Sequence, residues 1–261
     1  MQLTRTPVLI FFTPLFFLVL FTATSTVYSA ESSKKRAEEI LDKVDDLWRG
    51  DSSHGKFTME VKTKHYTRKM GMEAWSKGKE KSLIRILSPK KEKGTATLKS
   101  EDSIYTYLPK TDRTIRLTSG MMGGSWMGSH FTNDDLVRES RLKDDYEFDI
   151  TFEGDRKGIE VIEITLIPKP DAAVVWGKVV VVLRTADLMP VEQLYYDEDG
   201  LLVRTMSFSD IKMMGGRNFP ARMKIVPKDK PDEFTELVYE EMRFNLPLDD
   251  SLFSVSQLRK M

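Results

Sequence analysis

The histidines are the first side chains to consider for chemistry, because imidazole is both a common metal ligand and a general base. The chain has three, His54, His65 and His130. They are scattered and lack the spacing that would bring two ligands onto one face of a helix or strand. The sequence therefore predicts no metal site and no cofactor, and it places the three rings at exposed or edge positions.

The residues around His130 come close to two hydrolase patterns without completing either. Ser129 precedes His130 directly, and sequence neighbours do not have the Ser–His geometry of a triad. The run 123–127 resembles a nucleophile elbow, but Met127 stands in place of the last glycine. No Gly-Lys-Ser/Thr follows, so this is not a phosphate loop. A hydrolase that uses Ser125 or Ser129 on envelope lipids is the weakest of the functional alternatives.

The carboxylates and aromatics also have non-catalytic explanations. Asp134–Asp135 and Asp144–Asp145 could be acid–base pairs, but neighbouring acids at a helix start or in a loop are far more often solvated. Tyr105–Lys110 interleaves aromatics with lysine, as in some base-stacking surfaces. The whole chain counts 40 Lys+Arg against 40 Asp+Glu, which gives no electrostatic footprint for nucleic acid. We therefore expect neither an enzyme nor a nucleic-acid-binding protein.

One loop stands out by composition. Residues 120–131, called here the Met-rich loop, contain four glycines, three methionines and two aromatics. Thr132 or Asn133 can cap a helix after it, with Asp134 and Asp135 in the first turn. Methionine is flexible and polarizable and recurs on surfaces that fit varied apolar partners, which indicates a lipid or lipidated-chain site. Alternatively, the aromatics and Met127 simply fill the core.

The elements around this loop are mostly strands. Glu31–Arg49 has apolar residues at three- and four-residue spacings and is expected to be an amphipathic helix. From Lys56 onward the period changes to two, and Asp199-Gly200 marks a hairpin. Counting predicts a mainly β (α+β) fold with about 11–12 antiparallel strands, too many to stay flat. The curled half-barrel needs its apolar concave face covered by two or three helices, from Glu31–Arg49, 120–140 and a third candidate at Pro168–Trp176.

The first thirty residues have the layout of a secretory signal peptide: Arg5, an apolar run at Val8–Phe21, and small polar residues up to Ala30. We expect cleavage near Ala30, with an anchor that is kept as the alternative. Removing residues 1–30 takes away one base and no acid, so the mature chain carries one more acid than bases. Residues 31–261 have no cysteine and read as a single periplasmic domain and a monomer.

Several segments together resemble the outer-membrane lipoprotein-sorting family, the LolA-like group that includes LolB-like and RseB-like domains. The matching stretches are Leu87–Ala96, Ile104–Lys110, Ser125–Leu136, Met189–Gly200 and Gly216–Pro220. The resemblance covers the chain from about Lys34 to Leu258.

Two positions in the loop differ from the family pattern. His130 stands where Asp is expected, and Asn133 stands where an aromatic is common. Any role that depends on that acid is therefore not carried over to this chain.

The resemblance implies a non-catalytic periplasmic carrier, or chaperone, that holds acyl chains of lipoproteins or lipids in an apolar cavity and delivers them to or near the outer membrane. Its partners would be the acylated cargo, an inner-membrane lipid or lipoprotein exporter and an outer-membrane acceptor. The alternative is an RseB-like sensory or interaction module of the envelope.

Strand alternation and the Met-rich loop together give the candidate residues. Those expected to contact acyl chains are Phe57, Met59, Val61, Met70, Met72, Leu83, Met121, Met122, Trp126, Met127 and Phe131. The glycines expected to form a lid hinge are Gly120, Gly123, Gly124 and Gly128. Because the face of each strand is inferred from alternation, a register error would move whole sets of side chains.

Overall fold

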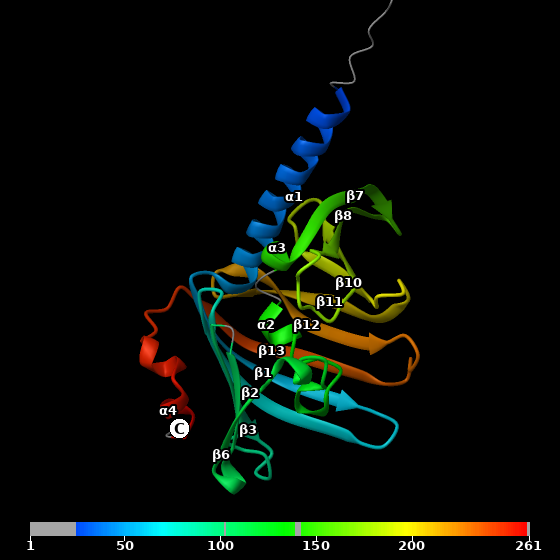
Figure 1. Ribbon diagram of the computed structural model, residues 1–261. Helices are drawn as coiled ribbons and strands as arrows, with labels where there is room; N and C mark the ends of the chain where they lie inside the picture. Colours follow the sequence, from blue (N-terminus) through cyan, green and yellow to red (C-terminus); the bar gives the residue numbers. More distant parts are fainter. Residues whose placement is uncertain (1–24, 102, 139–141, 260–261) are drawn as a thin grey trace, which may run out of the picture.

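The computed structural model describes residues 25–101, 103–138 and 142–259, and its centre is one antiparallel sheet of 13 strands (Figure 1). The strands are β1 (Ser52–Lys62), β2 (Thr67–Lys77), β3 (Lys81–Ser88), β4 (Ala96–Ser100), β5 (Ser103–Leu108), β6 (Arg113–Arg116), β7 (Tyr146–Arg156), β8 (Ile159–Pro168), β9 (Lys178–Arg184), β10 (Pro190–Tyr196), β11 (Leu202–Met214), β12 (Arg217–Pro227) and β13 (Phe234–Phe244). Their order is β6-β5-β4-β3-β2-β1-β13-β12-β11-β10-β9-β8-β7.

Two meanders meet at one long-range pairing to form this sheet. β1 pairs with β13 along most of its length. On one side of this pair, β2 to β6 follow one another to the edge of the sheet, and on the other side β12 to β7 do the same. β6 and β7 are the two edges, so the sheet is not closed into a barrel. The predicted mainly β antiparallel half-barrel is confirmed, with 13 strands where 11–12 were expected. The hairpin at Asp199–Gly200 joins β10 to β11, with Gly200 at φ +76°.

The long helix α1 (Ser25–Arg49) covers part of the apolar face of the sheet. Ala37, Ile40 and Leu41 are buried against it, and the Trp48 ring packs on those of Phe208 and Phe219. The helix begins at Ser25, earlier than the predicted start at Glu31. Residues 1–24 of the predicted signal peptide lie outside the described residues. In the described ranges, no helix combines the length and apolar character that a membrane crossing requires.

The other helices are short. They are the α-helices α2 (Asp135–Arg138), α3 (Leu142–Asp145) and α4 (Val255–Leu258), and the 3₁₀ turns η1 (Pro109–Thr111), η2 (Ser119–Met121), η3 (Trp126–Gly128) and η4 (Asp250–Phe253). The expected third cover, Pro168–Trp176, is not a helix. Pro170 disfavours the helical conformation at Lys169, and the segment is irregular, although Trp176 still packs against the core.

The two faces of the sheet carry separate apolar clusters. The larger one lies under α1, the Met-rich loop and α2, and includes Met59, Met70 and Phe131. Two smaller ones lie on the other face: one is formed by β3–β5 and the C-terminal segment, where Phe253 and Leu258 dock, and one by Val161, Val180 and Val182 on β8 and β9. Figure 1 shows α4 and α2 on opposite sides of β1–β3. The face that carries the larger cluster is therefore the candidate binding face, and it is called the apolar face below.

Candidate functional site

The apolar face contains a cavity of about 180 Å³. Its interior is mostly aromatic and aliphatic, and hydroxyls and Arg49 lie on one side. The lining residues are Trp48, Arg49, Ser53, Gly55, Phe57, Ala74, Trp75, Ser76, Ser82, Ile84, Trp126, Phe131, Leu136, Phe219, Met223, Leu237, Tyr239 and Met242. An apolar hollow with a polar side fits an amphiphile better than a small polar ligand.

Two smaller hollows adjoin this cavity through shared walls. One, of about 70 Å³, shares Phe131 and Leu136 with it and continues toward Trp176. The other, of about 60 Å³, shares Trp48 and Arg49 and runs under α1. The walls that separate them are side chains of α1, the Met-rich loop and α2, which are the covering elements rather than the sheet.

The Met-rich loop reaches the cavity through Trp126. The Trp126 indole is 4% exposed, and its Nε1–H donates to Thr97 Oγ1 at 3.1 Å. Its ring packs edge-on against Phe131, with the centroids 6.3 Å apart. An isolated β-bridge between Ser125 and Thr132 holds the two ends of this turn together. Trp126 therefore forms part of the cavity wall and is held there by one buried hydrogen bond, to Thr97.

The end of the loop is fixed by a reciprocal cap. Thr132 Oγ1 accepts from the Asp135 backbone N–H at 3.2 Å, and Asp135 Oδ2 accepts from the Thr132 N–H at 2.7 Å. This capping box confirms Thr132 as the cap of α2. The Trp176 indole also donates to Asp135, at 3.2 Å. Asp135 is thus engaged structurally, as expected for a carboxylate at a helix start.

Arg204, on β11, is the main residue that the sequence reasoning missed. Its guanidinium is 3% exposed, makes two hydrogen bonds to Asp135 and donates to the His130 carbonyl. The rings of Trp176 and Tyr195 lie 4.3 and 4.1 Å from it. Burial acts to lower the pKa of Arg204, but the charge and hydrogen bonds of Asp135 outweigh it and raise that pKa.

A signal for Arg204 was present in the sequence. Arg204, Met206 and Phe208 alternate on one strand, and the last two face the core, so Arg204 had to be an inward-pointing charge. Such a charge requires a buried partner.

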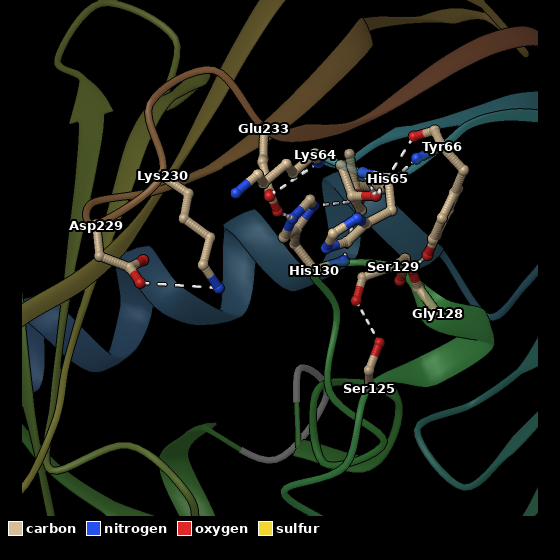
Figure 2. Close-up of polar contacts among 12 residues, drawn as sticks. Lys64, His65, Tyr66, Ser125, Gly128, Ser129, His130, Asp229, Lys230 and Glu233 are labelled. Atoms are coloured by element: carbon tan, nitrogen blue, oxygen red, sulfur yellow. Dashed lines mark hydrogen bonds and ion pairs between the residues drawn. The ribbon is translucent and has the colours of Figure 1, made fainter.

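His130 closes a second contact between the loop and the sheet (Figure 2). Its backbone N–H donates to Thr235 Oγ1 at 2.9 Å, and its Nδ1 lies 2.8 Å from the same hydroxyl. Its Nε2 lies 3.4 Å from Glu233 Oε2. The Lys64 backbone N–H also donates to Glu233 and, with His130, lowers the pKa of that carboxyl although partial burial opposes this. His130 and His54 are partly buried and hydrogen-bonded, whereas His65 is exposed.

Ser125 and Ser129, the two serines beside His130 in the sequence, bond to backbone groups of the loop and not to the imidazole. Ser129 Oγ donates to the Trp126 carbonyl at 2.7 Å and accepts from the Phe131 N–H at 3.1 Å. Ser125 Oγ bonds the Ser129 carbonyl. Within the described ranges neither serine is hydrogen-bonded to an imidazole, and no group of three potential metal ligands occurs.

The predicted acyl-contact residues fall into four groups. Phe57, Trp126 and Phe131 line the cavity. Met59, Val61, Met70 and Met72 are fully buried in the same cluster, and Met127 packs against it. Met121 is 43% exposed and Met122 is partly buried.

Leu83 faces the other side of the sheet, in the cluster under the C-terminal segment. Strand β3 turns Ile84 and Ile86 toward the core instead, because side chains alternate with period two.

The four glycines of the proposed hinge lie in an ordered turn. Gly124 N–H donates to the Met121 carbonyl at 3.0 Å and its own carbonyl accepts from Asn133. The Gly128 carbonyl accepts from the Tyr66 hydroxyl at 2.6 Å, and its φ of +66° favours glycine. Gly120 and Gly123 have open space around them. Hinge motion here stays a prediction.

Comparison with known proteins gives the fold relationships. A family model described as that of an uncharacterized protein matches residues 78–260, more than half of the chain. None of the curated proteins matches the chain in sequence.

Three solved structures resemble it over nearly all of their own length. A DUF1329 family protein from Desulfovibrio piger has a TM-score of 0.78 and 22% identity, over 87% of this chain and 99% of that one. A domain described as a putative outer membrane lipoprotein-sorting protein from Vibrio parahaemolyticus has a TM-score of 0.75 and 25% identity, over 88% of this chain and 99% of that one. A LolA superfamily protein from Nitrosomonas europaea has a TM-score of 0.72 and 22% identity, over 85% of this chain and 98% of that one.

Proposed function

We propose that this chain, whose structural neighbours include outer membrane lipoprotein-sorting and LolA superfamily proteins, is a periplasmic carrier of acyl chains. It binds the chains of lipoproteins or lipids on the apolar face of the sheet and delivers them to or near the outer membrane. It receives its cargo from an inner-membrane exporter and passes it to an outer-membrane acceptor. It acts by binding, without catalysis.

One observation supports this proposal above the others: the apolar cavity is walled by residues of α1, the Met-rich loop and α2 as well as by the sheet. Trp126, Phe131 and Leu136 close it on the loop side, and Trp48 of α1 closes it on another. Each methylene moved from water into such an environment gains roughly 0.8 kcal/mol. A chain of ten or more methylenes would therefore be held firmly.

Under this proposal the described form is the closed one. A dry apolar cavity of roughly 150 Å³ holds a ligand the size of benzene. The cavity of about 180 Å³ is therefore too small for a whole acyl chain. Binding requires the covers to move so that this cavity joins the two hollows beside it, and the shared walls at Phe131, Leu136 and Trp48 are the side chains that must shift.

The direct test is native mass spectrometry of the protein purified from its own periplasm, followed by denaturing lipid extraction. A bound acylated species at one-to-one stoichiometry would support the carrier function and identify the cargo class. A protein that is empty and also fails to take up a fluorescent fatty-acyl probe would favour the sensory module instead.

A pair of variants ties binding to the cavity. Ala74 lines the cavity, and Ala74→Trp would fill it, so probe binding is expected to fall at least tenfold. Ser209→Trp adds the same ring at an exposed position of β11 and should bind as the wild type does. Equal binding by both variants would place the acyl site elsewhere.

A further inference from the structure

The turns at one end of strands β1–β6 carry an excess of positive charge. We define the basic turn surface as residues 62–69, 89–95 and 109–113. Its exposed cations are Lys62, Lys64, Lys69, Lys90, Lys91, Lys93, Lys110 and Arg113. The whole chain balances 40 bases with 40 acids, so this excess is local.

The sheet register brings the three turns to the same end. Lys62 pairs with Thr67 across the β1–β2 turn, and Gly71, near the start of β2, pairs with Ser88 at the end of β3. Contacts then join the turns. Arg68 lies 3.4 Å from Glu92, and a Cβ on Gly94 would lie 3.5 Å from Pro109.

The acids within this surface are already engaged. Residues 62–69 contain none, and the other two turns contain only Glu92 and Asp112. Glu92 pairs with Arg68, and Asp112 accepts a hydrogen bond from the Tyr107 hydroxyl at 3.1 Å. The surface ends at the β12–β13 turn, where Asp229, Asp232 and Glu233 offset Lys228 and Lys230.

Exposed apolar groups lie in the β1–β2 turn and in the Met-rich loop that is hydrogen-bonded to it. Tyr66 is 42% exposed, and its hydroxyl donates to the Gly128 carbonyl of the Met-rich loop (Figure 2). Met121, in the same loop, is 43% exposed. Arg68 also donates to the Met127 carbonyl. The basic turn surface is therefore hydrogen-bonded to the loop that carries Trp126 of the cavity wall.

From this combination we propose that the basic turn surface docks on an anionic phospholipid membrane. Clustered Lys and Arg are attracted to acidic headgroups, and tyrosine is favoured at membrane–water interfaces, where its ring meets lipid and its hydroxyl meets water. Docking brings the Met-rich loop to the bilayer surface. The proposal goes beyond cargo binding and holds whether or not the cavity carries an acyl chain.

Vesicle flotation with the full chain tests the charge requirement. Wild type should bind phosphatidylcholine vesicles that contain phosphatidylglycerol, bind pure phosphatidylcholine vesicles far less, and be released by salt. Lys90→Glu/Lys91→Glu/Lys93→Glu should weaken binding at least tenfold. Lys35→Glu/Lys43→Glu/Lys157→Glu makes the same charge change at exposed positions on α1 and in the β7–β8 turn and should bind as wild type.

Because all variants keep residues 1–30, differences between them report the surface and not the apolar N-terminus. Equal binding of wild type and the Lys90/Lys91/Lys93 variant to the anionic vesicles, or equal loss in the two triple variants, would overturn the proposal.

A labelled cysteine gives a second, independent readout, since the chain has no natural cysteine. Met121→Cys carrying an environment-sensitive fluorophore should shift to the blue on anionic vesicles. Met213 is 69% exposed and lies at the end of β11 that is far from the basic turn surface. The label on Met213→Cys should therefore not shift. A shift at Met213 without one at Met121 would place the membrane contact on the other end of the sheet and overturn the proposal.

Discussion

The Arg204 guanidinium donates two hydrogen bonds to the Asp135 carboxylate, from Nη1 to Oδ2 at 2.8 Å and from Nη2 to Oδ1 at 2.7 Å. The pair links β11 of the sheet to the first residue of α2, 69 positions earlier in the chain. It thereby fixes the end of the Met-rich loop to the apolar face. Removing one member of a buried pair leaves an uncompensated charge.

Arg204→Met is therefore expected to lower the free energy of unfolding by about 3–5 kcal/mol, because Asp135 loses its charge partner. Urea unfolding followed by circular dichroism measures this. Arg113→Met, at an exposed position, serves as the control and should change stability by no more than about 0.5 kcal/mol. A loss of under about 1 kcal/mol for Arg204→Met would show that the pair is not needed to hold α2.

Trp126 allows the hydrogen bond and the apolar ring to be tested separately. Trp126→Phe removes the bond to Thr97 but keeps a ring in the cavity wall, and should cost about 1 kcal/mol while acyl-probe binding persists. Trp126→Asp places a carboxylate at that wall and should abolish probe binding in a protein that still folds. Folded Trp126→Asp that binds the probe normally would remove the loop from the site.

The hinge is tested at the glycines that have room for a side chain. Gly120→Ala and Gly123→Ala introduce no contact within 4 Å, so each should fold and gain up to about 1 kcal/mol through the less flexible unfolded chain. If the loop opens at these residues, stopped-flow release of the acyl probe should slow. Gly200→Ala is the matched control outside the loop, although its φ of +76° is expected to make it less stable. Unchanged release rates in both loop variants would argue against a hinge there.

Glu233 predicts a defined pH dependence. The hydrogen bond from the Lys64 N–H, with help from His130, holds its pKa below the ordinary value of 4.5. A carboxyl with a lowered pKa in the folded protein contributes stability above pH 4.5 and loses it as the pH falls through the folded pKa. Near pH 6 the free energy of unfolding of wild type should therefore exceed that of Glu233→Gln. At about pH 3 the difference between the two proteins should be smaller.

Urea unfolding at the two pH values measures this difference. Glu198→Gln, at an exposed position of the β10–β11 turn, controls for the loss of one charge. A stability difference between wild type and Glu233→Gln that does not change with pH would contradict this role of the carboxylate.

Local chemistry carried enough information to predict much of this protein from the sequence. Alternation from Lys56 onward predicted the antiparallel strands, and Asp199-Gly200 predicted the β10–β11 hairpin. The pair Thr132 and Asn133 predicted the start of α2, where Thr132 is the cap. These features depend on residues close in the chain, so a local pattern is sufficient. Trp126 and Phe131 of the Met-rich loop lie both in the core cluster and in the cavity wall, and their contact with acyl chains stays a prediction.

Only the tertiary structure decided which side chains meet. Leu83 and Ile84 are neighbours of similar type, and the pairing of β2 with β3 alone determines that Ile84 faces the cavity and Leu83 the C-terminal segment. Arg204 and Asp135 become partners because β11 is brought to α2 by a sheet whose two halves join at the β1–β13 pairing. A strand pattern has period two and carries no information about its distant neighbours, so the face of each strand and the buried ion pair follow from the register of the assembled sheet.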